Sequence, residues 1–381
     1  MNIFKVIIIF AIIAIMINCS EHRNDISVSN INVSDSIFFT EPLDTFPKGI
    51  IDSIYWIPLQ SSDKNIIKEI SKLCVTDSLI LICDKYQGLV QAYSKEGNFE
   101  YQIKNKGNGP YEYLEIAAFT ITPTSIYILD NYSNKISRYS IKTGRFIEKT
   151  TVPFVAWDME AFDDNDFLFT YLSNNPEAHI DYKPIGFAVW RTNEHWEITH
   201  QYLPVDKDYT ELYGKSRYFT RSGHNIVFHA LKYNGYFIFS ENEIPDFYPI
   251  MFSNPVPTDH NIRLDDVNKG HWQFLAETPF RLNGYGIVEI SVAGRGEQLF
   301  AIDSSKKIYS NSETNAQSIP IDIVGTMNNG FIGCINDNYD LYKTLTQYGF
   351  SKGNKDVESI LKRGGCCLII YQMKSLVPHN N

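Results

Sequence analysis

The sequence predicts an all-β fold, a ring of six four-stranded antiparallel blades, and three observations support this prediction. The order of apolar runs and polar turns in residues 79–113 is repeated in residues 125–149. Asp84 and Asp130 mark the repeat and lie 46 residues apart, and one propeller blade occupies roughly 40 to 50 residues. Tyr and Phe each occur 24 times, a content that favours strands over helices. The sequence therefore predicts a six-bladed β-propeller.

Six apolar runs are expected to form the second strand of each blade. They are residues 79–83, 125–129, 166–171, 225–229, 285–290 and 330–335. Their first residues lie 46, 41, 59, 60 and 45 residues apart, so the middle blades must carry longer loops. Short polar turns such as residues 95–98 and 328–330 are typical of the hairpins within a blade.

A ring of blades must be closed, because an open blade would leave an unpaired strand edge. The segment SIYWIPL, residues 53–59, precedes the first full blade, and CLIIYQM, residues 367–373, ends the last one. We expect these two segments to pair in one sheet. Residues 49–376 are then a single propeller domain, which we expect to be monomeric. Residues 377–381 remain as a tail.

One segment departs from the β pattern. Residues 355–363 place Val357, Ile360 and Leu361 at the i, i+3 and i+4 positions, and Gly364 follows. This spacing predicts one short amphipathic helix with a glycine stop, inside the last blade.

The N-terminus predicts export. Lys5 precedes twelve apolar residues, 6–17, whose helix would span about 18 Å, too short for a hydrocarbon layer of roughly 30 Å. Residues 1–18 are therefore expected to be a signal peptide. Cys19 follows directly and predicts a lipidated residue, with residues 19–48 as a polar tether. The alternative is an ordinary secretory signal with a chance cysteine.

The predicted location is the bacterial cell envelope, with the protein held through Cys19 on a membrane that we expect to be the outer one. The other five cysteines are Cys74, Cys83, Cys334, Cys366 and Cys367. They form an odd set embedded in apolar runs, which is not the pattern of a disulfide framework, and we expect buried free thiols.

Charge and motifs exclude several function classes. The net charge is −10 and there is no Lys/Arg run, so a nucleic-acid partner is not expected. No G-x-S-x-G, H-E-x-x-H, P-loop or C-x-x-C motif occurs. Asp163–Asp166 resembles a calcium loop but lacks a third oxygen ligand and a glycine, so no metal site or cofactor is predicted.

The propeller geometry gives the candidate ligand site. The innermost strand of each blade lines the central channel, so polar residues at the beginnings of these strands converge. The candidates are Lys72, Glu115, Trp157, Asp158, Arg217, Tyr218, Glu277 and Asp322. Carboxylates, cations and aromatic rings together suit a polar, ring-bearing ligand such as a sugar. The alternative is that these charges neutralise one another across a narrow wet channel.

Several stretches carry a resemblance to a known family. They are DSIYWIPL at residues 52–59, GNGPYEY at residues 107–113, CCLIIYQMK at residues 366–374, and the signal with its cysteine. Together they resemble the 6-bladed β-propeller lipoproteins of Bacteroidetes-type bacteria, relatives of the NHL-repeat propellers, over nearly all of the mature chain. The second stretch is similar to the family turn G-x-G-P-G-E-Y, but Tyr111 replaces the last Gly, and a residue with a Cβ resists positive φ. The resemblance implies the fold and export, and no settled activity.

Three hypotheses of function follow. The favoured one is a binding or interaction module for a glycan, peptide or protein partner. The second is a channel-centred enzyme, either a metal-dependent lactonase or hydrolase with calcium, or a quinone-dependent sugar dehydrogenase. The third is a structural partner of an outer-membrane complex, whose mark would be an exposed apolar patch on a blade edge. The fold alone does not separate them.

Overall fold

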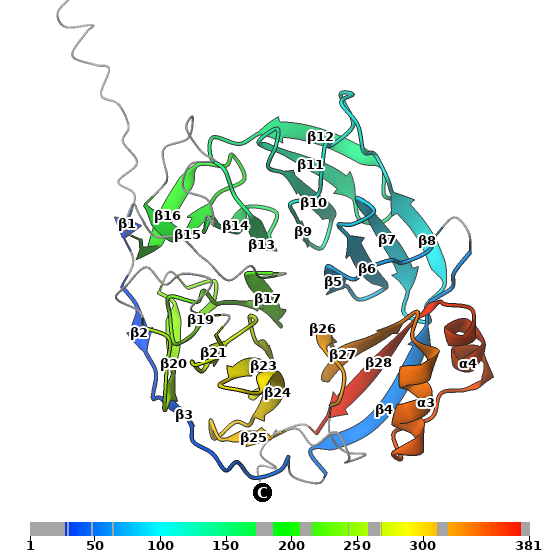
Figure 1. The fold of residues 1–381 in the computed structure, drawn as a ribbon. Coiled ribbons are helices and arrows are strands. Elements are labelled where there is room, and N and C mark those ends of the chain that lie inside the picture. The colour runs from blue at the N-terminus through cyan, green and yellow to red at the C-terminus, as the bar shows by residue number, and fades with distance from the viewer. Residues whose placement is uncertain are drawn as a thin grey trace, which may run out of the picture.

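The computed structural model describes residues 27–374 except 29, 47–48, 63–64, 173–185, 206–214, 216, 243, 258–266, 268 and 311–318. These residues form six antiparallel sheets arranged in a ring, which confirms the predicted six-bladed β-propeller (Figure 1). The predicted signal peptide, Cys19 and the tail lie outside the described residues.

The strands are numbered in chain order, and each blade is described from its innermost strand, next to the axis, to its outermost strand. Blade 1 consists of β5 (Lys72–Val75), β6 (Leu79–Asp84), β7 (Leu89–Ser94) and β8 (Phe99–Ile103). Blade 2 consists of β9 (Ala118–Ile121), β10 (Ser125–Asp130), β11 (Lys135–Ser140) and β12 (Phe146–Thr151). Blade 3 consists of β13 (Asp158–Asp163), β14 (Asp166–Thr170), β15 (Phe187–Thr192) and β16 (Ile198–Pro204).

Blade 4 consists of β17 (Phe219–Ser222), β18 (Asn225–Phe228), β19 (Gly235–Phe239) and β20 (Asp246–Phe252). Blade 5 has a divided inner strand, β21 (Phe274–Leu275) and β22 (Phe280–Leu282), followed by β23 (Tyr285–Val292), β24 (Gly296–Ile302) and β25 (Ile308–Ser310). Blade 6 consists of β26 (Ile323–Met327), β27 (Gly330–Asn336), β28 (Cys366–Met373) and β4 (Ile51–Pro58). The six predicted second strands are confirmed as β6, β10, β14, β18, β23 and β27.

The two chain ends close the ring as predicted. β28 pairs antiparallel with β4 over seven residue pairs that include Leu368 with Ile57 and Tyr371 with Ile54. Figure 1 shows the N-terminal strand beside the C-terminal one in the same blade. The last blade therefore has no unpaired edge where the ring would otherwise open.

The cores lie between neighbouring blades. Leu81 and Val90 of blade 1 pack with Phe119 and Ile126 of blade 2 in one buried cluster. In β10 all six residues are buried, because a blade in a ring has a neighbour on both of its faces. This is why the second strands appear in the sequence as continuous apolar runs rather than as an alternating pattern.

Two repeated aspartates hold the loops that lead into the inner strands. Asp84, fully buried at the end of β6, accepts hydrogen bonds from the backbone N–H groups of Lys68 and Glu69 at 2.8 and 3.1 Å. Asp130 occupies the same place in blade 2 and accepts from the N–H of Leu114 at 2.9 Å. The repeated aspartate that marks the blades in the sequence therefore has a structural role, because it binds the backbone of the loop before the inner strand.

The last blade contains two helices where one was predicted. The predicted helix is α4 (Lys355–Lys362), capped by Asn354, with Val357 and Leu361 buried. A second helix, α3 (Tyr339–Gln347), was not predicted, because Tyr342 and Leu345 are its only buried residues and two threonines weaken its helical signal. Both helices lie outside the ring beside β28 and β4 (Figure 1). No helix within the described ranges has the length and apolarity that crossing a membrane requires.

The described part of the predicted tether is part of the propeller. It contains β1 (Ser27–Val28), β2 (Asn32–Val33) and β3 (Ile37–Phe39). β1 pairs in parallel with β16, and both β2 and β3 pair in parallel with β20, along the outer edges of blades 3 and 4 (Figure 1). We call residues 30–46 the belt.

The belt stays attached to the blades because it buries apolar side chains. The polar composition of residues 19–48 as a whole conceals these few apolar residues. Ile37 and Phe39 are buried while Phe38 between them is exposed, as the alternation of a strand requires. The Phe39 ring lies 5.7 Å from that of Phe252 in blade 4 and 5.1 Å from that of Phe300 in blade 5. The belt therefore fills the junction between these two blades.

Candidate functional site

The predicted site residues lie on one face of the ring. In blade 1, Lys72 at the beginning of the inner strand pairs with Cys83 near the end of the second strand. The beginnings of inner strands and the turns after second strands therefore share a face, which we call the start face. All eight candidates lie at or just before the beginning of an inner strand or, for Glu277, within the divided inner strand of blade 5: Lys72, Glu115, Trp157, Asp158, Arg217, Tyr218, Glu277 and Asp322.

The interior of the channel is filled by a charged network around Glu160 on β13. Its Oε2 atom lies 2.7 Å from Lys72 Nζ of blade 1, and its Oε1 atom lies 2.7 Å from Arg221 Nη2 of blade 4. Thr120 of blade 2 donates its hydroxyl to Glu160 Oε1 at 2.7 Å. One carboxylate thus joins inner strands of four blades.

The charges of this network are matched within the protein. Burial by itself would raise the pKa of Glu160, but the positive charges of Lys72 and Arg221 outweigh it and lower that pKa to about 2. Burial would lower the pKa of Lys72, but the negative charges of Asp158 and Glu160 hold it above its ordinary value. Both groups are therefore charged near neutral pH.

Asp158 is likewise engaged by its surroundings. It lies 3.6 Å from Lys72 Nζ, and its Oδ2 atom accepts hydrogen bonds from the backbone N–H groups of Tyr218 and Phe219 at 2.9 and 3.0 Å. Two predicted residues, Lys72 and Asp158, are thus brought together by the fold. Glu160 and Arg221 were not predicted, although Glu160 follows Asp158 by two residues and so faces the same side of its strand.

A second charged group lies at the mouth of the channel between blades 4, 5 and 6. Burial raises the pKa of Glu289 on β23 to about 7, and the negative charges of Asp322 and Glu277 add to this effect. Arg217 and Lys215 act in the opposite direction. We call these five residues the mouth cluster. It combines three predicted residues, Arg217, Glu277 and Asp322, with Lys215 and Glu289, which no sequence motif marks.

Arg217 is oriented from two sides. Its guanidinium lies 4.8 Å from the centre of the Phe280 ring, and its Nη2 atom donates to the carbonyl oxygen of Ile323 at 3.4 Å. With three carboxyl groups and two cations the mouth cluster carries excess negative charge when Glu289 is ionised. Such a group can accept hydrogen bonds from hydroxyl or ammonium groups of a ligand.

The remaining predicted residues lie elsewhere on the start face. Glu115 is not part of the mouth cluster: burial and the negative charge of Asp130 raise its pKa, while Lys85 and Lys106 oppose this. Trp157 stacks on Tyr171, with ring centres 6.0 Å apart and planes 8° from parallel. The structure therefore separates the eight candidates into the channel interior, the mouth and the outer part of the face.

Exposed tyrosines occupy equivalent turns in blades 1 and 2. Tyr86 and Tyr132 follow Asp84 and Asp130 by two residues and are 78% and 76% exposed. Both turns come directly after a second strand and so belong to the start face. Tyrosine rings exposed to this extent contribute nothing to a core and are typical of recognition surfaces.

The turn at residues 107–113 forms without positive φ. The positive-φ residues of the described chain do not include Gly107, Gly109 or Tyr111, so the replacement of a glycine by Tyr111 costs no backbone strain. A Cβ at Gly107 would lie 2.2 Å from Glu112 Oε2, so the Glu112 side chain would have to move to accommodate it. That carboxylate folds back and accepts a hydrogen bond from the N–H of Gly109 at 2.7 Å. A cavity of about 170 Å³ lies between this turn and Asp130.

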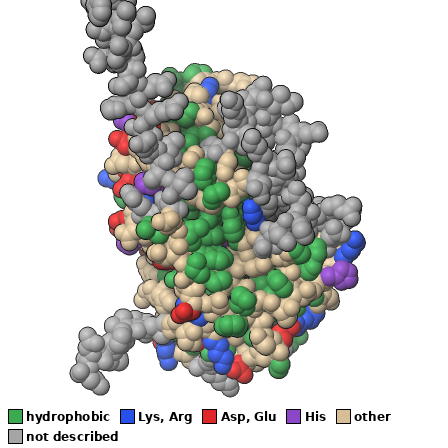
Figure 2. Space-filling view, turned by 90° about the vertical axis from the view of Figure 1, so that its left-hand side faces the viewer, with side chains coloured by type: hydrophobic (Ala, Val, Ile, Leu, Met, Phe, Trp, Pro, Cys, Tyr) green, Lys and Arg blue, Asp and Glu red, His purple; other side chains and the backbone are tan. Residues whose placement is uncertain are grey.

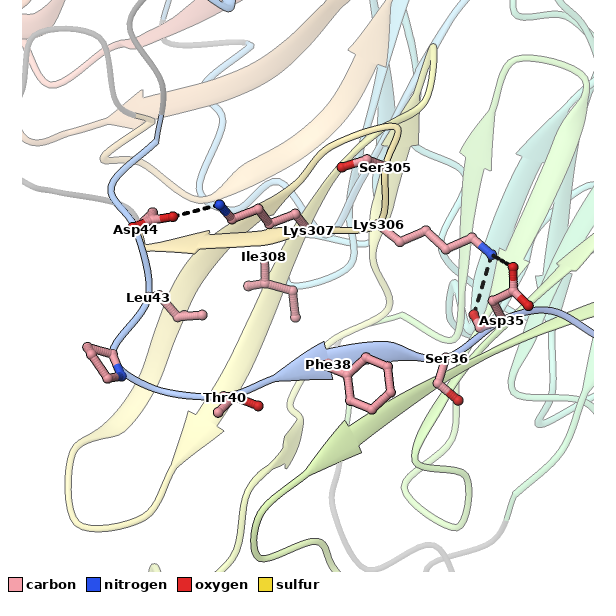
Figure 3. Close-up of a pocket in the computed structure, with 11 residues that line it drawn as sticks. Asp35, Ser36, Phe38, Thr40, Leu43, Asp44, Ser305, Lys306, Lys307 and Ile308 are labelled. Atoms are coloured by element: carbon pink, nitrogen blue, oxygen red, sulfur yellow. Dashed lines mark hydrogen bonds and ion pairs between the residues drawn. The ribbon is translucent and has the colours of Figure 1, made fainter.

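A larger cavity, of about 420 Å³, lies between the belt and the turn that joins β24 to β25 (Figure 3). Lys307 Nζ lies 2.6 Å from Asp44 Oδ2, and Lys306 Nζ lies 3.5 Å from Asp35 Oδ2. Figure 3 shows both lysines extending from the turn to aspartates of the belt. These ion pairs attach the belt to blade 5. Within the described part of the chain, no group of three or more His, Cys, Asp or Glu side chains is arranged to hold a metal ion.

Comparison with known proteins agrees with this architecture. Residues 30–278 match the model of a family, DUF5128, described as a 6-bladed beta-propeller. The chain belongs to this family. The matched range includes the belt. No curated protein matches the chain.

Two solved structures of Bacteroides proteins are similar to this member of the family. A putative exported protein from Bacteroides fragilis NCTC 9343 aligns with a TM-score of 0.72 at 16% identity, over 89% of this chain and 100% of that one. A member of the DUF4221 family from Bacteroides vulgatus ATCC 8482 aligns with a TM-score of 0.51 at 9% identity, over 85% of this chain and 97% of that one. At these identities the likeness establishes the fold.

Proposed function

We propose that this protein is an exported binding module that takes a polar, ring-bearing ligand, such as a glycan, on its start face. The observation that carries the proposal is the contrast between the channel interior and the surface above it. The interior charges around Glu160 are satisfied by one another, whereas Tyr86 and Tyr132 are exposed and the mouth cluster gains excess negative charge when Glu289 ionises.

The side chains of this face fit the chemistry of a sugar. Aromatic rings cover the apolar faces of pyranose rings, and carboxylates accept hydrogen bonds from their hydroxyl groups. Trp157 and Tyr171 supply a stacked pair of rings on the start face, and Tyr86 and Tyr132 supply two separate ones. Peptide ligands with aromatic or cationic side chains are the alternative class within the same proposal.

Binding to the start face is testable with the full-length protein. A panel of soluble oligosaccharides is screened by tryptophan fluorescence and by isothermal titration calorimetry. For a sugar that binds, the double variant Tyr86→Ala/Tyr132→Ala should weaken affinity by at least tenfold. The control is Tyr348→Ala, an exposed tyrosine at the end of α3, outside the ring. Equal affinities of the double variant and the control would contradict the proposed surface, and a peptide panel distinguishes the second ligand class.

The channel-centred enzyme remains the competing hypothesis, and one observation favours the binding module over it. Asp158 and Glu160, the two buried carboxylates of the inner strand β13, are already bound to Lys72, Arg221 and backbone N–H groups. A lactonase would need such carboxylates to face a cation or substrate. Elemental analysis of the purified protein decides the point, because stoichiometric calcium or zinc would favour the enzyme.

The anchor belongs to the same proposal. Export is supported by the likeness to a putative exported protein, and the position of Cys19 directly after an apolar signal supports lipidation. Replacement of Cys19 by Ala should release the protein from membranes into the soluble fraction. Retention of that variant on membranes would contradict lipid anchoring without affecting the ligand-binding proposal.

A specific observation favours a second candidate function, a docking partner in an envelope complex. An apolar patch lies on the outer edge of blade 4, where Phe38 of the belt pairs directly with Met251, and the two are 66% and 51% exposed. Val33 of β2, on the same edge, is 72% exposed. Figure 2 shows hydrophobic side chains gathered on this side of the molecule. Exposed patches of this kind are typical of protein interfaces.

Docking through this patch is tested by photo-crosslinking in the cell of origin. A photoreactive amino acid at Phe38 or Met251 should give a discrete protein adduct, and the same group at Ile147, an exposed residue on the outer strand of blade 2, should give none. Sedimentation of the purified protein shows whether a second copy is the occupant. The absence of adducts at both patch positions would remove this candidate.

A further inference from the structure

Two cysteines of blade 6 lie in contact. Cys334 on β27 and Cys366 at the beginning of β28 place their Sγ atoms 3.3 Å apart. The strands are antiparallel, with Cys334 opposite Leu368 and Asn336 opposite Cys366. Because alternate residues of a strand share a face, the two cysteines are diagonal neighbours on the same side of the blade.

Both side chains take part in the contact between blades 6 and 1. Cys366 is buried in a cluster with Ile82 and Tyr93 of blade 1, and Cys334, which is partly exposed, packs against the same cluster. Cys367 follows Cys366 in sequence but belongs to a different cluster, where its Sγ atom lies 3.9 Å from the carbonyl oxygen of Val357. The pleat of the strand thus keeps Cys367 away from the pair.

We propose that Cys334 and Cys366 form a disulfide bond in the oxidising compartment to which the chain is exported. The inference rests on the export part of the proposed function and on none of its ligand chemistry. Disulfides form and persist outside the reducing cytosol, and two thiols already in contact need little rearrangement. An Sγ–Sγ bond is about 2.05 Å long, so the two sulfur atoms must approach by roughly 1.2 Å.

The chain around the pair allows this approach. Gly364 and Gly365 precede Cys366, and Cys366 is the first residue of β28, where the ladder begins. Diagonal partners in an antiparallel sheet are further apart than directly opposite ones, so the bond should be under strain. A strained disulfide is more easily reduced than an ordinary structural one.

The oxidation is balanced by thiol–disulfide exchange. Cys334 is the thiol that solvent reaches, whereas the hydrogen bond with Cys334 and burial raise the pKa of Cys366. The Cys334 thiolate attacks a disulfide oxidant, such as oxidised glutathione, and forms a mixed disulfide while one oxidant thiol leaves. Cys366 then loses its proton, displaces the second oxidant thiol and completes the bond. The two protein thiols are oxidised by two electrons and the oxidant is reduced to two thiols.

The bond would link β27 to the beginning of β28, the strand that pairs with the N-terminal β4. It would also close the loop of residues 335–365, which contains both helices. A link at this position restrains the unfolded chain and stabilises the blade that closes the ring.

The test uses the purified full-length protein treated with oxidised glutathione or with dithiothreitol. Thiols are counted in denaturant, and the linked peptides are identified by mass spectrometry. Oxidised wild-type protein should lose two thiols and yield a peptide that links Cys334 to Cys366. The melting temperature should fall by several degrees on reduction. Variants Cys334→Ala and Cys366→Ala should show neither effect.

The matched control is Cys367→Ala, which removes a neighbouring thiol on the opposite face and should keep both effects. Two intact thiols at Cys334 and Cys366 after oxidation would overturn the proposal, as would a link that involves Cys367. Because the oxidation is carried out on purified protein, its outcome is independent of whether Cys19→Ala releases the chain from membranes.

Discussion

Glu160 Oε2 lies 2.7 Å from Lys72 Nζ, an ion pair that joins blade 3 to blade 1 across the axis of the propeller. The Glu160 side chain is fully buried and is also bound by Arg221 and Thr120. Removal of this carboxylate would leave Arg221 without its ion pair and Lys72 with only the longer contact to Asp158. The stability of the ring is therefore expected to depend on this one residue.

Replacement of Glu160 by Gln should lower the free energy of unfolding by about 3 kcal/mol, because Arg221 loses its carboxylate partner and buried Lys72 keeps only Asp158, at 3.6 Å. The measurement is urea unfolding followed by circular dichroism. The control is Glu148→Gln, which breaks the exposed pair with Arg138 at 3.3 Å and should cost less than about 1 kcal/mol. Similar costs for the two variants would show that the network does not stabilise the fold.

The same carboxylate should contribute to acid sensitivity. The pKa of Glu160 is about 2 in the folded protein, below its ordinary value of 4.5, so the folded state binds its proton less readily than the unfolded state. Its stabilisation is present above pH 4.5 and is lost as the pH falls toward 2. The difference in unfolding free energy between wild type and Glu160→Gln should therefore shrink over this range.

Glu289 should give a pH dependence of the opposite sign. Its pKa in the folded protein is about 7, above the ordinary value of 4.5, so the folded state holds the proton more tightly. Its contribution is favourable below pH 4.5 and is lost as the pH rises through 7. Relative to Glu289→Gln, the wild type should become less stable between these values.

Asp322→Asn provides the control for Glu289, because it removes one of the negative charges that raise the pKa. In that background the pH at which the Glu289 contribution is lost should move below 7. A pH profile that is identical in the two backgrounds would mean that the mouth cluster is not electrostatically coupled.

The belt should behave as part of the core on one side only. Phe39→Ala is expected to cost about 3 to 5 kcal/mol, because its ring packs against Phe252 and Phe300. The adjacent Phe38→Ala should change stability by less than about 0.5 kcal/mol, because Phe38 is exposed. Thermal unfolding of the two variants makes the comparison, and equally small effects would indicate a loose tether.

Substitutions at Gly107 and Glu112 should have coupled effects on the free energy of unfolding. Gly107→Ala places a Cβ against the Glu112 carboxylate, which must move and lose its hydrogen bond with the N–H of Gly109, at a cost of roughly 1 kcal/mol. In the Glu112→Ala background the same change should cost less, because the opposing carboxylate is absent. A double-mutant cycle on unfolding free energies measures this coupling, and additive effects would show that the glycine serves another purpose.

Much of the architecture was predictable because propeller blades repeat. The six second strands and the pairing of residues 53–59 with residues 367–373 follow from apolar runs and from the need to close a ring. The helix over residues 355–363 was also predictable from its spacing, whereas α3 was not, since it buries only two side chains. The belt was predicted to be a tether because residues 19–48 are polar on average, and this composition concealed two deeply buried side chains, Ile37 and Phe39.

The sequence by itself determined the strands, their order and the face on which the eight candidate residues gather, because these depend on local periodicity and on one topological rule. Only the tertiary structure decided which charges meet. Lys72 and Glu160 are 88 residues apart in the chain and belong to blades that are not adjacent, so no local pattern joins them. Glu289 and Asp322 are 33 residues apart and belong to neighbouring blades, and no local pattern joins them either. Which residues face one another across the channel depends on how all six blades close into a ring. No single segment of the sequence carries this information.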